Sequence, residues 1–93
     1  MKVRWSETAL SELDDIFSYI HQNSRSAAVA VVQRIEALTE LLEEFPLVGH
    51  LTDEAGVRVL AVVRYPFLIF YAIDETAGGI VILHVLHTAQ QRP

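Results

Sequence analysis

The chain has 93 residues, of which 52% are hydrophobic and 20% charged, so it is long enough for one core and too short for two. Its formal net charge is −5, and residues 1–56 carry four basic and ten acidic side chains, which disfavours non-specific binding to a nucleic-acid backbone. It has no cysteine, which excludes disulfide bonds, and no apolar run reaches the roughly 18 residues that span a membrane, so we expect a cytoplasmic single domain over residues 1–93 with no membrane contact.

The first half of the chain has the pattern of two amphipathic helices. Ser6 is a typical helix N-cap, and apolar residues recur at helical spacing over 6–22. A second apolar stripe runs over 26–45, where Ser24 or Ser26 can cap the helix and a proline ends it. Because few residues join the two helices, we predict an antiparallel helical hairpin.

The second half of the chain has the texture of a β-sheet. Runs rich in β-branched and aromatic residues predict strands at 57–64, 67–73 and 80–87, and residues 1–5 form a short β-prone opening. The order is therefore β-α-α-β-β-β. We predict an α+β fold in which the N-terminal helical hairpin packs on one face of an antiparallel sheet.

The last two predicted strands, 67–73 and 80–87, are apolar on both faces. A strand with water on one side alternates between apolar and polar residues, so both faces of this sheet need a cover. One helical hairpin covers one face. We expect an apolar groove for a partner on the other face, and the alternative is that large residues between Tyr65 and Tyr71 fill it.

The sequence contains neither a known catalytic motif nor a metal-binding spacing of histidines. His21 and His50 lie at a helix end and in a loop, while His84 and His87 differ by three and so point to opposite faces of a regular strand. We therefore expect no metal and no cofactor.

Arg58 and Arg64 have the same parity on one predicted strand, so they share a face roughly 20 Å apart, too far to hold one phosphate together. They either form surface ion pairs with the acidic helical half or contact a partner. His87 is the candidate for proton transfer, because the ordinary pKa of imidazole lies near neutral pH.

Several short motifs together resemble a known family. They are, in chain order, Val3-x-Trp5-Ser6, Pro46-x-x-Gly49, Gly56-x-Arg58, Tyr65-Pro66-Phe67 and Ile82-Leu83-His84-Val85-Leu86-His87. In order and spacing the chain resembles the RelE/ParE superfamily of type II toxin–antitoxin toxins, especially its ParE-like, plasmid-stabilisation branch.

The resemblance implies a small toxin that an antitoxin neutralises by wrapping its C-terminal segment around it. RelE-like members cut mRNA on the ribosome, whereas ParE-like members inhibit DNA gyrase without cutting RNA. The chain departs from the RelE-like pattern, since Leu68 aligns with an arginine of that branch and the residues after His87 lack its basic segment. It also departs from many ParE-like sequences, where the position of His84 is frequently arginine.

We therefore predict a toxin without catalytic residues that binds DNA gyrase, pairs with a cognate antitoxin and tends to self-associate when the antitoxin is absent. One alternative is a ribosome-dependent mRNA endoribonuclease, whose catalytic candidates are Arg58, Arg64 and His87. Another is a degenerate, non-toxic homologue that keeps antitoxin binding. The residues predicted to contact a target or antitoxin are Arg58, Arg64, Tyr65, Phe67, Tyr71, His84 and His87.

Overall fold

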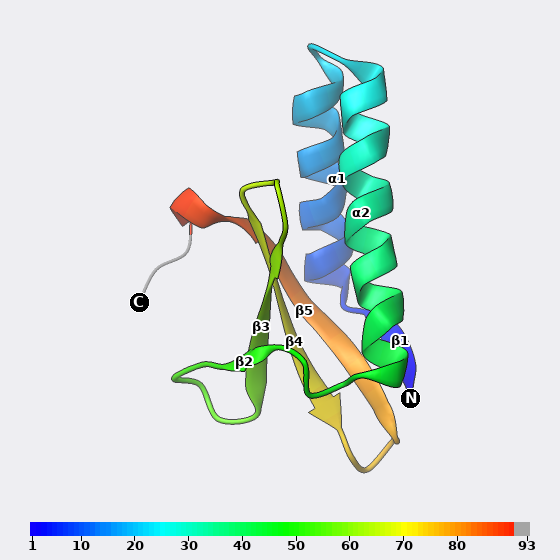
Figure 1. Ribbon diagram of the computed structural model, residues 1–93, viewed down its shortest axis with the longest axis vertical. Helices are drawn as coiled ribbons and strands as arrows, with labels where there is room; N and C mark the ends of the chain where they lie inside the picture. The colour runs from blue at the N-terminus through cyan, green and yellow to red at the C-terminus, as the bar shows by residue number, and fades with distance from the viewer. Residues whose placement is uncertain (91–93) are drawn as a thin grey trace.

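A computed structural model describes residues 1–90 as two helices packed against a five-stranded sheet (Figure 1). The α+β class is confirmed, and the chain has one strand, β2, that the sequence did not predict. The elements in chain order are β1 (Lys2–Trp5), α1 (Glu7–His21), α2 (Arg25–Glu44), β2 (His50–Leu51), β3 (Val57–Val62), β4 (Phe67–Asp74), β5 (Gly79–His87) and a 3₁₀ turn, η1 (Thr88–Gln90).

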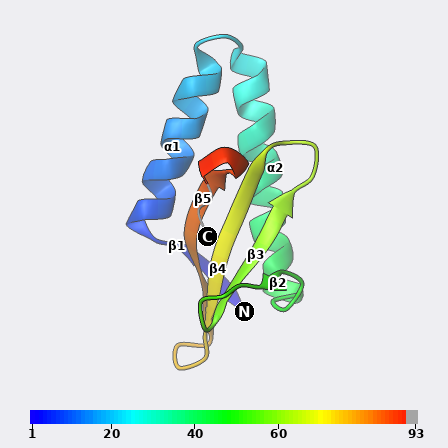
Figure 2. The ribbon, with the colours of Figure 1, turned by 90° about the vertical axis from the view of Figure 1, so that its left-hand side faces the viewer.

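Both helices begin at the expected serine caps. The Ser6 hydroxyl accepts a hydrogen bond from the Ala9 backbone N–H at 3.0 Å, and the Ser24 hydroxyl accepts one from Ala27 N–H at 3.1 Å. Each cap satisfies a backbone donor that the helix itself leaves unpaired. The two helices lie side by side and antiparallel in both views of the ribbon (Figures 1 and 2). None of the helices within residues 1–90 is both long enough and apolar enough to cross a bilayer.

The sheet is mixed rather than antiparallel, which corrects the prediction. Its strand order is β1-β5-β4-β3-β2, and the pairs from β2 to β5 are antiparallel. β1, however, runs parallel to β5, with Val3 opposite Ile80 and Trp5 opposite Ile82. The apolar pattern of a strand does not indicate which other strand it pairs with. The pairing of β1 with β5, at opposite ends of the chain, therefore could not be predicted from the sequence around either strand.

A β-bulge interrupts β5. Phe70 of β4 pairs with His84, but the next residue, Tyr71, pairs with Ile82, so Leu83 is the additional residue. A bulge exchanges the faces on which the following side chains lie. His84 therefore lies on the outer face, at the edge of the sheet, whereas Val85 is buried on the helix face. The prediction that His84 and His87 point to opposite faces is confirmed, because His87 pairs with Phe67, a residue of the helix face.

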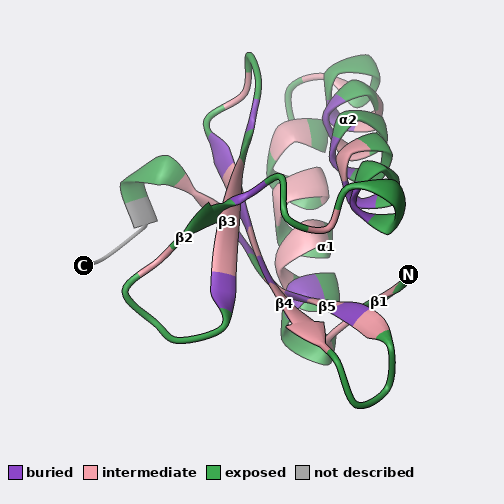
Figure 3. Cartoon of the chain, turned by 60° about the horizontal axis from the view of Figure 1, so that its bottom comes forward, coloured by how far each residue is buried: buried purple, intermediate pink, exposed green. Residues whose placement is uncertain are grey.

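The core lies between the helical hairpin and one face of the sheet (Figure 3). The helices cover only this face, as predicted, and the side chains of the outer face, such as Leu68, Phe70 and Val81, are half-buried. The core residues are Ala9, Val31, Ile35 and Leu42 from the helices and Val62, Phe67, Ile69, Tyr71, Ile80, Ile82 and Val85 from the strands.

Candidate functional site

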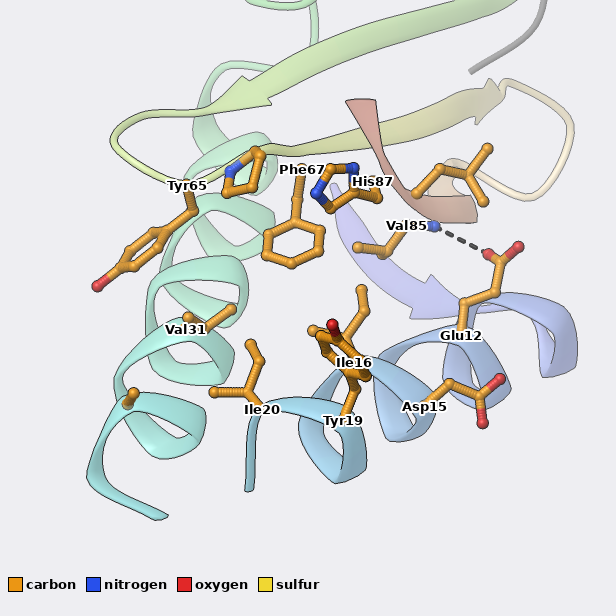
Figure 4. A pocket seen from close by; sticks show the side chains of 13 residues that line it. Glu12, Asp15, Ile16, Tyr19, Ile20, Val31, Tyr65, Phe67, Val85 and His87 are labelled. Atoms are coloured by element: carbon orange, nitrogen blue, oxygen red, sulfur yellow. Dashed lines mark hydrogen bonds between the residues drawn. The ribbon is translucent and has the colours of Figure 1, made fainter. Parts of the chain in front are cut away.

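An open apolar pocket of about 690 Å³ lies between the helical hairpin and the end of the sheet where β4 begins and β5 ends (Figure 4). The sequence predicted an apolar groove on the outer face of the sheet, and the pocket is instead on the helix side. Its lining residues are Glu12, Asp15, Ile16, Tyr19 and Ile20 of α1, Ala27 and Val31 of α2, Tyr65 and Pro66 of the turn after β3, Phe67 of β4, and Val85, Leu86 and His87 of β5.

The pocket exists because the helical hairpin continues past the end of the sheet (Figure 1). Ile16 and Ile20 of α1 and Val31 of α2 belong to the same apolar stripes that pack on the sheet nearer its centre. Here they face Phe67 and Val85 across the pocket (Figure 4). Apolar side chains that a longer sheet would cover therefore form the walls of an open cavity.

Two carboxylates, Glu12 and Asp15, lie on the α1 side of this pocket. β1 ends at Trp5, so the edge of β5 beyond Ile82 has no neighbouring strand within the described residues. Glu12 covers this edge: its Oε1 accepts a hydrogen bond from Val85 N–H at 2.9 Å, and its Oε2 lies 3.1 Å from Nδ1 of His84. The carboxylate thus satisfies a backbone donor that a longer β1 would have satisfied.

His87 lies on the opposite side of the pocket. Its ring meets Phe67 edge to face, with centroids 5.5 Å apart, and its Nδ1 accepts a hydrogen bond from Ala89 N–H at 3.0 Å. In the neutral ring the proton is therefore on Nε2. Three of the residues predicted to contact a partner, Tyr65, Phe67 and His87, line the pocket, and His84 is tied to Glu12 beside it.

Arg58 and Tyr71 lie away from the pocket and hold the loop that follows α2. The Tyr71 hydroxyl donates to the carbonyl of Pro46 at 2.8 Å and accepts from Gly49 N–H at 2.9 Å. Nη1 of Arg58 donates to the carbonyls of Leu47 at 3.1 Å and Gly49 at 2.8 Å. Tyr71 is 0% exposed, and Arg58 is bonded to two carbonyls, so both side chains have a structural role in holding this loop.

Arg64 does not share a strand face with Arg58, which corrects the prediction. β3 ends at Val62, and a turn closed by Tyr65 N–H on the Val62 carbonyl holds Arg64 at φ +78°. Of the three nuclease candidates, Arg58 lies apart from His87: it pairs with Tyr71, four strand residues, or roughly 13 Å, from the pair Phe67–His87.

The sequence did not single out the helical side of the pocket. Ile16, Ile20 and Val31 recur at the spacing of core residues, and most of each stripe does pack in the core. Element lengths give no signal either, since twenty helical residues and the nine residues of β5 both extend about 30 Å. Tyr19, an aromatic side chain that is 72% exposed, lies at this end of α1.

Comparison with known proteins gives concordant matches. The sequence model of the family described as "ParE toxin of type II toxin-antitoxin system, parDE" matches residues 3–92. The Sinorhizobium fredii protein "Putative toxin Y4kP" is 35% identical over 92 residues, covering 99% of this chain and 93% of that protein.

Two solved structures have the same fold. A chain of the chromosomal ParDE system from P. aeruginosa superposes with a TM-score of 0.81 at 26% identity, covering 94% of this chain and 95% of that one. A chain of the toxin–antitoxin complex RelBE2 from Mycobacterium tuberculosis gives a TM-score of 0.61 at 27% identity, covering 92% and 95%. The resemblance seen in the sequence motifs is confirmed: the chain belongs to the ParE toxin family of type II toxin–antitoxin systems.

Proposed function

We propose that this toxin acts in the cytoplasm by binding and inhibiting DNA gyrase, and that a cognate antitoxin neutralises it by occupying the pocket between the helical hairpin and the sheet. The pocket carries the proposal. It is open, its walls are mostly apolar, and its carboxylates lie on the α1 side. Such a cavity suits a protein segment with one apolar side.

The positions of the candidate catalytic groups favour inhibition by binding over RNA cleavage. Cleavage requires a base or acid and a cation around one phosphate. The guanidinium of Arg58, one of the two candidate cations, is bonded to two loop carbonyls, and its strand position is roughly 13 Å from that of His87. The net charge of −5 also opposes binding among ribosomal phosphates.

An amphipathic antitoxin segment fits the pocket chemically. Its apolar side would cover Ile16, Ile20 and Phe67, and a lysine or arginine beside that side would approach Asp15. The solved relatives include a ParDE system and a RelBE2 toxin–antitoxin complex, which supports an antitoxin as the occupant.

The antitoxin part is tested by thermal unfolding with a peptide from the C-terminal segment of the cognate antitoxin. A peptide that binds only the folded toxin stabilises it by about 4 kcal/mol at a free concentration a thousandfold above its Kd. Asp15→Lys should weaken this stabilisation, whereas Asp14→Lys, an equal charge change at an exposed neighbour that does not line the pocket, should not. Equal effects of the two variants would contradict the proposed site.

The target is tested by two assays on the purified toxin. We expect inhibition of DNA supercoiling by gyrase and no ribosome-dependent cleavage of mRNA. Cleavage that is lost in His87→Gln would instead establish the endoribonuclease alternative, and inactivity in both assays would establish the degenerate homologue.

A further inference from the structure

Exposed apolar side chains gather where α2 leads into β2. Nine large hydrophobic residues are exposed in the described part of the chain, and five of them lie within residues 41–51. Leu47 and Leu51 are 64% and 71% exposed. A contiguous apolar patch is uncommon on the surface of a monomer, and where one occurs it commonly marks a binding site. The α2–β2 surface, as we name it, consists of Leu41, Phe45, Leu47, Val48 and Leu51.

This surface is held in one conformation. Tyr71 and Arg58 bind the loop between its members by four hydrogen bonds, to Pro46, Leu47 and twice to Gly49. Gly49 is buried, and a Cβ there would lie 2.7 Å from the Tyr71 ring, so only glycine allows this approach. In Figure 3 the connection between α2 and β2 is coloured mostly as exposed, with a buried stretch just before β2. A preorganised loop loses little conformational entropy on binding.

The α2–β2 surface includes the last strand of the sheet. β2 pairs with β3 on one side, and within residues 1–90 no strand lies on its other side. An open strand edge accepts an extended segment of another chain through backbone hydrogen bonds. The occupant that best fits this edge is therefore extended.

The charges around the α2–β2 surface select the chemistry of the occupant. Residues 39–55 contain five carboxylates and neither lysine nor arginine. Two cations beside this segment are hydrogen-bonded to its backbone, since Arg58 binds loop carbonyls and the amino group of Met1 donates to the Glu43 carbonyl at 3.0 Å. A second copy would bring like charges together, whereas a basic segment would neutralise them. All five carboxylates are exposed, and Glu44, Asp53 and Glu54 are close in sequence to Phe45 and Leu51 of this surface, whereas Glu40 and Glu43 face the β1 side of α2, where they line a hollow with Val3 and Trp5.

We propose that the α2–β2 surface binds an extended protein segment in which apolar residues alternate with lysine or arginine. This surface is separate from the pocket, because none of its five residues lines the pocket, and in Figure 1 β2 lies below the end of β5. It is a second interaction site, and it does not depend on which partner fills the pocket.

The test uses the whole chain, labelled with ¹⁵N, and two capped peptides, Lys-Val-Lys-Val-Lys-Val and Glu-Val-Glu-Val-Glu-Val. We expect the lysine peptide to shift amide signals of residues 41–51 saturably, more weakly as salt is added, and the glutamate peptide to shift none of them. The double variant Leu47→Ser/Leu51→Ser should raise the Kd about tenfold. Leu10→Ser, an exposed leucine on α1, should leave the Kd unchanged.

A second variant covers the case in which the double serine variant does not fold. Asp53→Lys/Glu54→Lys changes only exposed charges and should also weaken binding of the lysine peptide. Equal binding of both peptides, signal shifts confined to the pocket, or no effect of the charge reversal would overturn the proposal. So would a dimer in sedimentation that Leu47→Ser/Leu51→Ser abolishes, since the occupant would then be a second copy.

Discussion

Tyr71 connects the core of the sheet with the surface loop that follows α2. Its ring is fully buried in β4, while its hydroxyl serves as donor to Pro46 and acceptor from Gly49. Buried polar groups contribute most through the cost of leaving their partners unsatisfied. One oxygen atom therefore fixes two backbone groups of the loop and, through them, the exposed leucines beside it.

Replacing Tyr71 by phenylalanine should lower the free energy of unfolding by about 1–3 kcal/mol, because Gly49 N–H and the Pro46 carbonyl each lose a partner. Urea denaturation measures the difference. Tyr19→Phe is the matched control, since the Tyr19 side chain is mostly exposed, and it should change stability by less than about 0.5 kcal/mol. A small effect at Tyr71 would show that water replaces the hydroxyl.

Arg64 has a backbone conformation that side chains with a Cβ rarely adopt, with φ at +78° in the turn between β3 and β4. The left-handed region costs an L-residue about 1–2 kcal/mol, and β-branched residues more. Arg64→Gly should therefore increase the stability by less than about 1 kcal/mol, as glycine also gives the unfolded chain more freedom. Arg64→Val should lower it by about 1–2 kcal/mol. Equal urea midpoints for the valine variant and the parent chain would refute this interpretation of the turn.

At the scale of elements, a helix completes the edge of the sheet. β1 pairs with β5 only up to Ile82. Beyond Ile82, the side chains of Ser6 and Glu12, at the start and in the first half of α1, form hydrogen bonds with the backbone of β5. Ser6 N–H donates to the Ile82 carbonyl at 3.0 Å and its hydroxyl to the Leu83 carbonyl at 3.2 Å. Uncovered strand edges invite pairing with other chains, so the start of α1 protects β5 as well as packing on it.

Removing the Glu12 carboxylate should expose this edge. In Glu12→Ala the amide of Val85 loses its acceptor, and its hydrogen exchange should become faster by an amount that corresponds to about 1–2 kcal/mol. Glu12→Gln retains an acceptor oxygen and should restore most of the protection. Ser11→Ala, a change at an exposed neighbouring residue, serves as the control. Unchanged exchange at Val85 in Glu12→Ala would mean that the carboxylate is dispensable there.

The helices and most of the strands could be predicted from the sequence, but the pairing of the edge strands could not. Helices and their caps follow from local signals, namely a serine and a 3.6-residue apolar period, so α1 and α2 were placed within a residue or two. The positions of β4 and β5 also followed from apolar runs between turns. The parallel edge strand, the bulge at Leu83 and the two-residue β2 depend on partners distant in the chain, and no local pattern encodes them.

The site was predictable in part for the same reason. Tyr65 and Phe67 belong to one of the family-like motifs and His87 is a candidate for proton transfer, and all three line the pocket. Tyr71 looked the same in sequence, yet its side chain is buried, since exposure depends on which loop returns to cover a residue. Ile16 and Ile20 looked like core because a helix stripe does not indicate where the sheet beneath it ends.

For the whole molecule, the open pocket and the net charge act in opposite directions on self-association. Apolar walls favour pairing of free toxin molecules through the pocket, while a charge of −5 on each repels them. Sedimentation of the isolated chain should therefore show association that rises with protein and with salt concentration. Tyr19→Lys should reduce it, and Leu47→Ser/Leu51→Ser should not. A chain that stays monomeric at high salt and high concentration would contradict this prediction.

The parallel pairing of β1 with β5 also determines when the fold can close during synthesis. Ser6, which lies between β1 and α1, is bonded to Leu83, 77 residues later. While the ribosome is still making residues 79–87, β1 has no strand to join and the core lacks Ile80, Ile82 and Val85. Contacts between such distant residues form late and slow the folding of a domain. Since Val85 and His87 are walls of the pocket, neither the pocket nor a complex that fills it can form on a nascent chain that has not yet reached β5.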